Sequence, residues 1–236
     1  MILVIAFLAS LIPSLALFFC LRNIKKEDSE YKKICNKAFL YGLLSVFPIL
    51  LVSGIFALIE SQSGLKNMNY IVDQVFHDFI VLALAEELVK FFAAKKILKE
   101  FQYNYSWMDI IAVGTIVGLA FGLAEDIPYA ISAGVEMMIL RGICAGHAVY
   151  AFVAMYFYGK GLKEGDNKIM YSGCLVSWLF HGVYDFCLTP EFIDYTGFIS
   201  LLIAFLEFIT LIFIFVFIFK KGRKEKYTEP LNVEIR

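Results

Sequence analysis

The residues of this chain that could do chemistry are ionisable side chains set inside long apolar runs. The first group is Glu86, Glu87 and Lys90 in the segment A-E-E-L-V-K. On a helix, Lys90 lies one turn from both glutamates and can neutralise one of them. A charge in hydrocarbon is kept only where it meets a partner, water or a ligand. The second carboxylate therefore predicts a function beyond helix packing.

A second carboxylate group follows a stripe of glycines. Gly114, Gly118 and Gly122 repeat every four residues, and Glu125 comes three residues after the last of them. Small residues at this spacing let helix backbones approach closely. The stripe therefore predicts a close helix contact that brings Glu125 against a neighbouring helix.

Two histidines stand in later apolar runs. His147 follows a glycine in the middle of one run, and His181 precedes Asp185 by one helical turn in H-G-V-Y-D. A carboxylate at that spacing can accept a ring N–H and fix the imidazole tautomer. We expect Asp185 to orient His181 in this way.

These residue types can form a hydrolytic centre in two ways. Two histidines and one carboxylate make a catalytic Zn²⁺ site when water takes the fourth position, and a further glutamate then serves as general base. The chain offers His147, His181 and Glu125 as ligands, with Glu86 or Glu87 as the base. Without metal, a glutamate would activate water while a histidine stabilises the oxyanion. Either version hydrolyses an amide inside the membrane.

Composition places these residues in a membrane protein. Of the 236 residues, 60% are hydrophobic and 18% are charged, and the mean hydropathy is +0.74. A soluble domain is about half apolar and about a quarter charged. The net charge of −1 leaves no basic excess to attract phosphate, which excludes a nucleic-acid-binding protein. The expected surroundings are the lipid bilayer.

Apolar runs of about 20 residues, the length of a membrane-crossing helix, recur along the chain. They predict an all-α, polytopic bundle of about seven transmembrane helices in a single domain over residues 1–236, with the catalytic core at about 71–187. The predicted spans are Met1–Leu21, Ala38–Ile59, Ile71–Ala94, Trp107–Ala130, Met137–Tyr158, Ile169–Cys187 and Thr196–Phe219. The connection between the first two spans is expected to be a loop or an amphipathic segment at the inner surface.

Basic residues set the predicted orientation. Of the 21 lysines and arginines, 18 fall in the first, third and fifth connections and in the tail at 220–236. Because cytoplasmic segments carry the basic excess, the N-terminus is predicted outside and the tail in the cytoplasm. The protein is accordingly expected in the cell membrane of a bacterium, as a multi-pass protein.

Depth in the bilayer gives a further expectation. Glu125 lies about 27 Å along its helix from Trp107 at 1.5 Å per residue, which is the outer half of the membrane. Glu86 and Glu87 fall nearer the inner half of their own span. The cavity is predicted to open outward, although these two depths disagree.

Together, these residues resemble the PrsW family of intramembrane proteases, which is related to the CAAX-protease and bacteriocin-processing membrane proteases. Four short motifs in order on successive predicted spans carry the resemblance. They are E-E-x-x-K (Glu86, Glu87, Lys90), F-x-x-x-E (Phe121, Glu125), an R…G-H element (Arg141, Gly146, His147) and H-x-x-x-D (His181, Asp185).

The resemblance implies site-one cleavage of a membrane-anchored anti-sigma factor in a stress response. It also implies that Glu86, Glu87 and His181 are essential. The wider group carries histidine where Glu125 stands, so its metal-free glutamate mechanism does not transfer intact. A glutamate there makes a metal site more plausible, because glutamate is a common third ligand beside two histidines.

Two other function classes stay open at this point. A proton- or cation-coupled transporter would also keep carboxylates and histidines in its spans. Such a protein ideally shows inverted repeats, and the chain has none that can be read. A catalytically inactive membrane scaffold of the same fold is the second alternative, against which the intact E-E-x-x-K argues. The sequence assigns no role to Arg141 or Glu207.

Overall fold

The structure is a computed structural model that describes residues 2–65, 69–101, 103–132 and 146–199, and part of 201–235. Its described elements are helical, and the extended pairing found among them is an isolated bridge between Ser106 and Pro230. The helices are α1 Ile2–Arg22, α2 Ser29–Leu44, α3 Val46–Ser63, α4 Tyr70–Phe76, the π-helix η2 His77–Leu84, α5 Ala85–Glu100, α6 Trp107–Ser132, α8 Gly146–Glu164, α9 Asn167–Leu188 and α10 Pro190–Thr196. The predicted all-α class is confirmed for this part of the chain.

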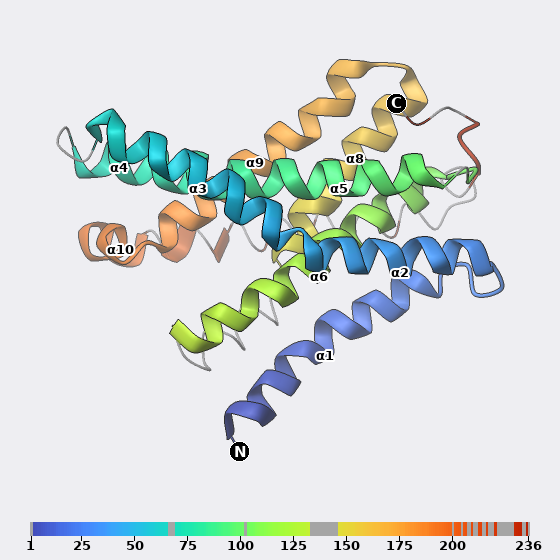
Figure 1. The fold of residues 1–236 in the computed structure, drawn as a ribbon, viewed down its shortest axis with the longest axis horizontal. Coiled ribbons are helices and arrows are strands. Elements are labelled where there is room, and N and C mark those ends of the chain that lie inside the picture. Colours follow the sequence, from blue (N-terminus) through green and yellow to red (C-terminus); the bar gives the residue numbers. More distant parts are fainter. Residues whose placement is uncertain are drawn as a thin grey trace.

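The predicted runs and the observed helices agree in part. The first, third, fourth and sixth runs lie in helices, the second is divided between α2 and α3 at Ser45, and the fifth and seventh fall partly outside the described residues. The third run is one continuous rod made of α4, η2 and α5, which runs along the longest axis of the molecule (Figure 1). Two helical stretches among the described residues, Ser29–Ser63 and Trp107–Ile127, are long and apolar enough to cross a bilayer. The arrangement of seven spans stays a prediction.

The connection expected to be a loop or an amphipathic segment contains a helix that packs one face against the core. Helix α2 begins at Ser29, where the Asp28 side chain accepts a hydrogen bond from the Tyr31 amide at 2.8 Å. Tyr31, Ile34 and Ala38 then recur at three- and four-residue spacing and are buried in the main hydrophobic core. Such spacing aligns apolar side chains on one face of a helix. The segment is thus a packed helix with a polar outer face.

The glycine stripe of α6 faces α8, as predicted. A Cβ atom on Gly118 would collide with the His147 carbonyl oxygen, and one on Gly122 would lie 3.2 Å from Cδ2 of the His147 ring. Only glycine allows this approach, so the stripe brings the first turn of α8 directly against α6. The predicted close helix contact is confirmed, and it is the contact that places His147.

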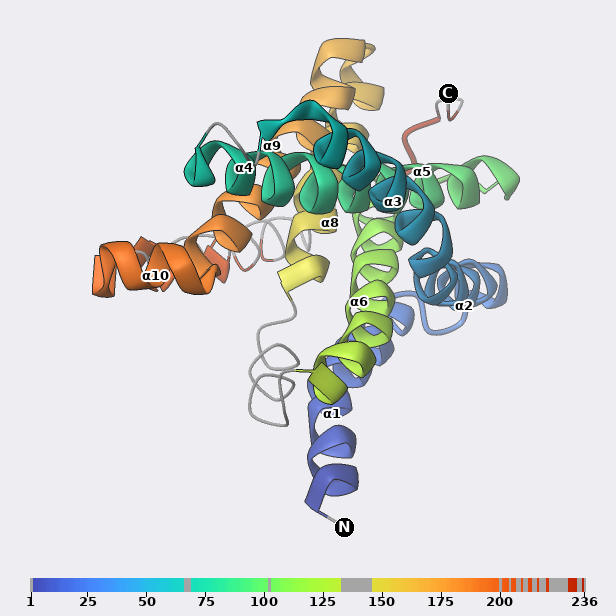
Figure 2. The ribbon, with the colours of Figure 1, turned by 60° about the vertical axis from the view of Figure 1, so that its left-hand side comes forward.

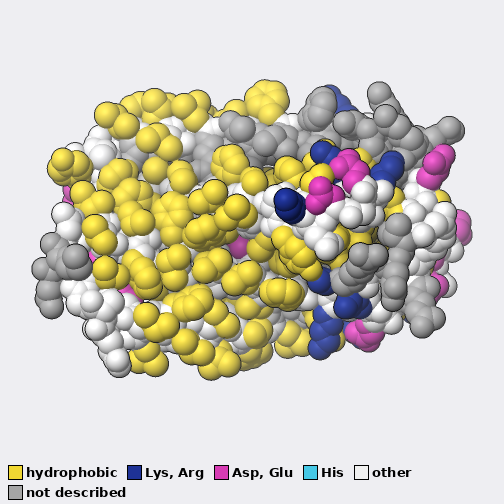
Figure 3. Space-filling view, turned by 90° about the horizontal axis from the view of Figure 1, so that it is seen from above, with side chains coloured by type: hydrophobic (Ala, Val, Ile, Leu, Met, Phe, Trp, Pro, Cys, Tyr) yellow, Lys and Arg dark blue, Asp and Glu magenta, His cyan; other side chains and the backbone are white. Residues whose placement is uncertain are grey.

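The surface has the character of a protein embedded in lipid. Figure 3 shows one face covered largely by hydrophobic side chains, with lysine, arginine and acidic residues gathered toward one end. On α3, the large apolar side chains of Phe47, Leu50, Leu51 and Leu58 are all exposed. Soluble monomers rarely expose apolar patches of this extent, whereas a bilayer would cover them.

We expect Gly118→Ala to lower the free energy of unfolding by about 1–3 kcal/mol, the usual effect of overpacking. The added methyl group has to push α8 away from α6, because its neighbour is backbone. Gly54→Ala in α3 is the matched control, since nothing lies within 4 Å of its Cβ position. Thermal unfolding of both variants in detergent tests this, and equal stabilities would contradict the close contact.

Candidate active site

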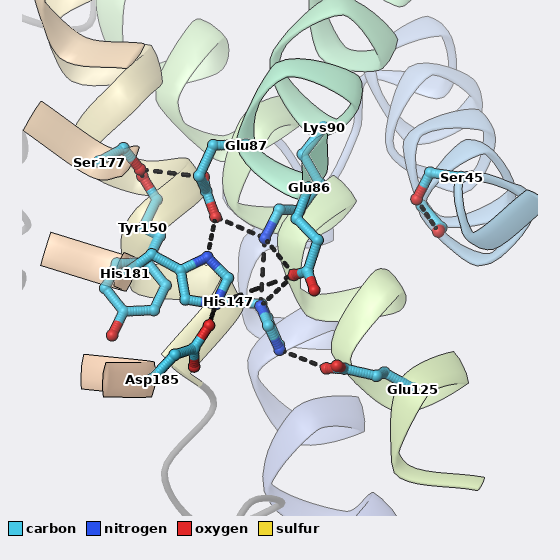
Figure 4. A network of polar contacts seen from close by, with 11 residues as sticks. Ser45, Glu86, Glu87, Lys90, Glu125, His147, Tyr150, Ser177, His181 and Asp185 are labelled. Atoms are coloured by element: carbon cyan, nitrogen blue, oxygen red, sulfur yellow. Dashed lines mark hydrogen bonds and ion pairs between the residues drawn. The ribbon is translucent and has the colours of Figure 1, made fainter. Parts of the chain in front are cut away.

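Three side chains converge at the centre of the bundle (Figure 4). Glu86 comes from α5, His147 from α8 and His181 from α9, and one ligand atom of each lies within 4.8 Å of the others. Oε2 of Glu86 lies 3.6 Å from Nδ1 of His147 and 3.9 Å from Nε2 of His181. Glu86 is therefore the carboxylate that both rings face.

His181 has a carboxylate beside each ring nitrogen. Its Nδ1 lies 2.9 Å from Oε1 of Glu87, and its Nε2 lies 3.3 Å from Oδ2 of Asp185. Glu87 is buried and close enough to accept the ring N–H of Nδ1, and in the neutral ring the lone pair is then on Nε2. Glu87 therefore contacts Nδ1 of His181 and is the closer of the two carboxylates. Asp185, which the sequence predicted as the partner of this ring, contacts the other nitrogen, Nε2.

His147 is held in a comparable way. Its Nε2 lies 2.6 Å from Oε2 of Glu125, a distance typical of a charge-assisted hydrogen bond. With the N–H on Nε2, the lone pair is on Nδ1, which accepts from the Lys90 ammonium at 3.1 Å. Glu125 therefore orients the ring from its far side, and Nδ1 faces Glu86.

The donor set at the centre suits a divalent metal ion. In both rings a carboxylate binds one nitrogen, which is the usual outer support of a metal-binding histidine. The other two nitrogens, Nδ1 of His147 and Nε2 of His181, face Glu86, and Nδ1 also accepts from Lys90. A lone pair pointing at carboxylate oxygens is repulsive unless a proton or a cation lies between them. Of the three expected ligands, His147 and His181 meet at this point, whereas Glu125 lies behind His147.

Lys90 supplies positive charge to the same cluster. Its buried ammonium lies 2.6 Å from Oε1 of Glu87 and 3.5 Å from Oε2 of Glu86, and it stands 4.8 Å from the Phe121 ring centroid. Glu87 takes the closer contact, in agreement with the prediction that Lys90 neutralises one of the two glutamates. Glu86 and Glu87 are two carboxyl groups beside one ammonium, so Lys90 can neutralise only one of them and a cation at Glu86 could neutralise the other.

The course of the third rod accounts for the meeting of residues that helix rise alone placed at different depths. Its π-helical part, His77–Leu84, ends directly before the two glutamates, and short π-helical stretches are frequent at functional sites. Figures 1 and 2 show α5 crossing α6 rather than running parallel to it. Helices that cross can meet at one level, so Glu86 and Glu125 both reach the ring of His147 although helix rise alone placed these glutamates at different depths.

Two further residues, Ser177 and Tyr150, belong to the cluster and were not among the candidates from the sequence. The hydroxyl of Ser177 lies 3.0 Å from Oε2 of Glu87, and the Tyr150 ring stacks on the His181 ring at 4.7 Å between centroids. Ser177 is one turn before His181, and Tyr150 is one turn after His147. Their helical spacing from the histidines is the signal that could have found them.

Two residues of uncertain role, Arg141 and Glu207, lie outside the described residues. The Arg141 part of the R…G-H element therefore has no structural counterpart here, while its Gly146 and His147 open α8.

Comparison with known proteins decides the family. The sequence model of the PrsW family intramembrane metalloproteases matches residues 30–219. The chain belongs to the PrsW family. The match covers α2 through α9 and therefore every helix that contributes to the cluster around Glu86.

Individual PrsW relatives extend over most of the chain. Protease PrsW of Geobacillus kaustophilus is 27% identical over 189 residues, which cover 78% of this chain and 79% of the relative. Protease PrsW of Shouchella clausii is 29% identical over 192 residues, covering 77% and 82%. Protease PrsW of Bacillus subtilis is 28% identical over 188 residues, covering 77% and 81%. No solved structure matches the chain.

Membership of the PrsW family makes the chain a membrane-embedded protease. The family is described as metalloproteases, and the cluster of Glu86, His147 and His181 is a candidate metal site consistent with that description. The predicted protease class is confirmed.

We expect Glu86→Gln, Glu87→Gln and His181→Ala each to lower cleavage about 100-fold or more, because each removes a group that contacts the reacting centre or holds one that does. Glu60→Gln is the matched control. Glu60 is also a buried glutamate paired with a histidine, His77, at 3.2 Å, but it belongs to α3 and lies outside the cluster.

Cleavage of a single-span substrate by the purified variants gives the measurement. Full cleavage by both Glu86→Gln and Glu87→Gln would show that this cluster is not the hydrolytic centre. If Glu60→Gln lost as much cleavage activity as these two variants, the loss would reflect the removal of any buried charge.

Proposed function

We propose that this chain is a zinc-dependent intramembrane endopeptidase that makes the first cut in a membrane-anchored regulator of the anti-sigma-factor type. The convergence of Glu86, His147 and His181 from three helices, each histidine backed by its own carboxylate, is the observation that carries the proposal. The family description and the names of the relatives support the proteolytic reaction.

In this proposal the metal ligands are Glu86, Nδ1 of His147 and Nε2 of His181. The Lys90 ammonium would leave Nδ1 when metal binds and keep its contact with Glu87. Glu as a third ligand beside two histidines is a common catalytic zinc set. Bound there, zinc lowers the pKa of a coordinated water and polarises the scissile carbonyl. Glu125 and Glu87 hold the two rings through their other nitrogens.

The chain's own residues also supply a proton acceptor. Glu87 is engaged by Lys90, His181 and Ser177, so it is poorly placed to take a proton from water. Asp185 is partly exposed and lies beside Nε2 of His181, at the edge of the cluster. We therefore assign to Asp185 the role of accepting the proton from the attacking water and passing it to the leaving amine.

The apolar side chains around the cluster exclude water from the site of the proposed reaction. Glu86, Glu87, Lys90 and His181 are all buried, so bulk water does not screen their charges. Electrostatic interactions are stronger where water is excluded, which favours charge that develops on the peptide oxygen. The substrate in this proposal is the membrane-spanning segment of another protein, which can reach a site at this depth.

Metal dependence is tested with the purified protein and a candidate single-span substrate in detergent. Cleavage should stop after treatment with a zinc chelator and return when zinc is added in slight excess. Chelator already saturated with zinc is the control for effects of the chelator itself. Cleavage that survives complete removal of metal would instead favour Glu86 as a general base without metal.

The membrane arrangement of this proposal is the seven-span topology in the bacterial cytoplasmic membrane, with the N-terminus outside. Reporter fusions at Gly64, at Lys163 and after Arg236 should report outside, inside and inside, because the basic residues gather on the inner side. A C-terminus found outside would invert the predicted opening of the cavity.

A further inference from the structure

Ser177 occupies the point where the three ligand-bearing helices meet. It lies on α9 one turn before His181 and is fully buried. Its Oγ is 3.0 Å from Oε2 of Glu87 on α5 and 2.6 Å from the main-chain oxygen of Tyr150 on α8. One small side chain on the helix that supplies His181 thus contacts the two helices that supply Glu86 and His147 (Figure 4).

The contact with Glu87 completes the support of that carboxylate. Its Oε1 already accepts from the Lys90 ammonium at 2.6 Å and from Nδ1 of His181 at 2.9 Å. A glutamate carboxylate that is hydrogen-bonded at one oxygen can still rotate about its Cγ–Cδ bond. A donor on Oε2 removes this freedom, so Ser177 fixes the plane of the group that orients His181.

The hydroxyl has one proton and two neighbouring acceptors. Hydrogen bonds to an ionised acceptor are roughly twice as strong as those between neutral groups. Glu87 carries the charge, and the Tyr150 oxygen is an uncharged main-chain carbonyl in a helix. The proton is shared between Oε2 of Glu87 and the closer Tyr150 carbonyl oxygen as a three-centre hydrogen bond, and the charge on Glu87 strengthens the longer of the two contacts.

We propose that Ser177 is a positioning residue of the metal site, which acts through Glu87 to hold the His181 ring with Nε2 directed at Glu86. The proposal rests on the proposed function, because it assigns Nε2 of His181 to a metal ion. Ser177 itself touches neither the metal nor the substrate in this assignment.

Cobalt binding tests the proposal without any substrate. Metal-free full-length protein in detergent is titrated with Co²⁺, and the visible absorption of the bound ion gives both the affinity and the ligand geometry. Ser177→Ala removes the donor, and Ser177→Cys fills nearly the same volume with a weak one. Ser172→Ala is the matched control, because Ser172 is on the same helix but donates to the carbonyl of Ile169.

The parent and Ser172→Ala should bind one Co²⁺ per chain with equal affinity. Both Ser177 variants should bind about 10–100-fold more weakly, as is usual when an outer partner of a ligand is lost. Their absorption bands at saturating Co²⁺ should also shift, because the His181 ring is no longer held. If Ser177→Ala does not accumulate as folded protein, Ser177→Cys carries the comparison.

Two results would overturn the proposal, and they are distinguishable. Saturable binding by the parent with unchanged affinity and spectrum in the Ser177 variants would reject the role of Ser177 and leave the metal site intact. A parent protein that binds no Co²⁺ would reject the metal site, and with it both proposals.

Discussion

Charged groups inside an apolar bundle have to find their hydrogen-bond partners within the protein, and here two carboxylate–imidazole pairs meet that need. Glu125 binds Nε2 of His147, and Glu87 binds Nδ1 of His181. In the neutral rings each pair places the proton on the nitrogen that faces it, so the other nitrogen of each ring points toward the same carboxylate, Glu86. The chemistry of the site follows from this arrangement of protons, because these two nitrogens and the central carboxylate together form a ligand set.

The fold serves this arrangement through helix contacts that allow very close approach. Gly118 and Gly122 let α8 lie against α6, which brings His147 to Glu125. On the other side, Gly182 receives the Phe79 ring of the π-helix, and the Trp178 indole donates to the Phe79 carbonyl at 2.5 Å. The π-helix is thus anchored to α9 directly before the two glutamates, which sets the register between Glu87 and His181.

Much of this could be predicted from sequence because polar residues in hydrocarbon are informative. The motif residues, the all-α class and the close contact along the α6 glycines followed from residue type and helical spacing. Which carboxylate contacts which histidine nitrogen could not be predicted in this way. Spacing along one helix put Asp185 next to His181, but the Nδ1 proton goes to Glu87 on another helix, 94 residues away in sequence. Similarly, helix rise alone placed Glu86 and Glu125 at different depths, because it contains no information about crossing helices or the π-helical turn.

X-ray absorption at the zinc edge of the purified protein is the most direct measurement of the central claim, that Glu86, His147 and His181 hold one metal ion. The spectrum should show nitrogen and oxygen neighbours at about 2.0–2.2 Å with the scattering of two imidazole rings. His147→Ala should reduce that signal to one ring, since Nδ1 of His147 is assigned as a ligand. Sulfur neighbours at about 2.3 Å, or two imidazole rings retained in His147→Ala, would contradict the assignment.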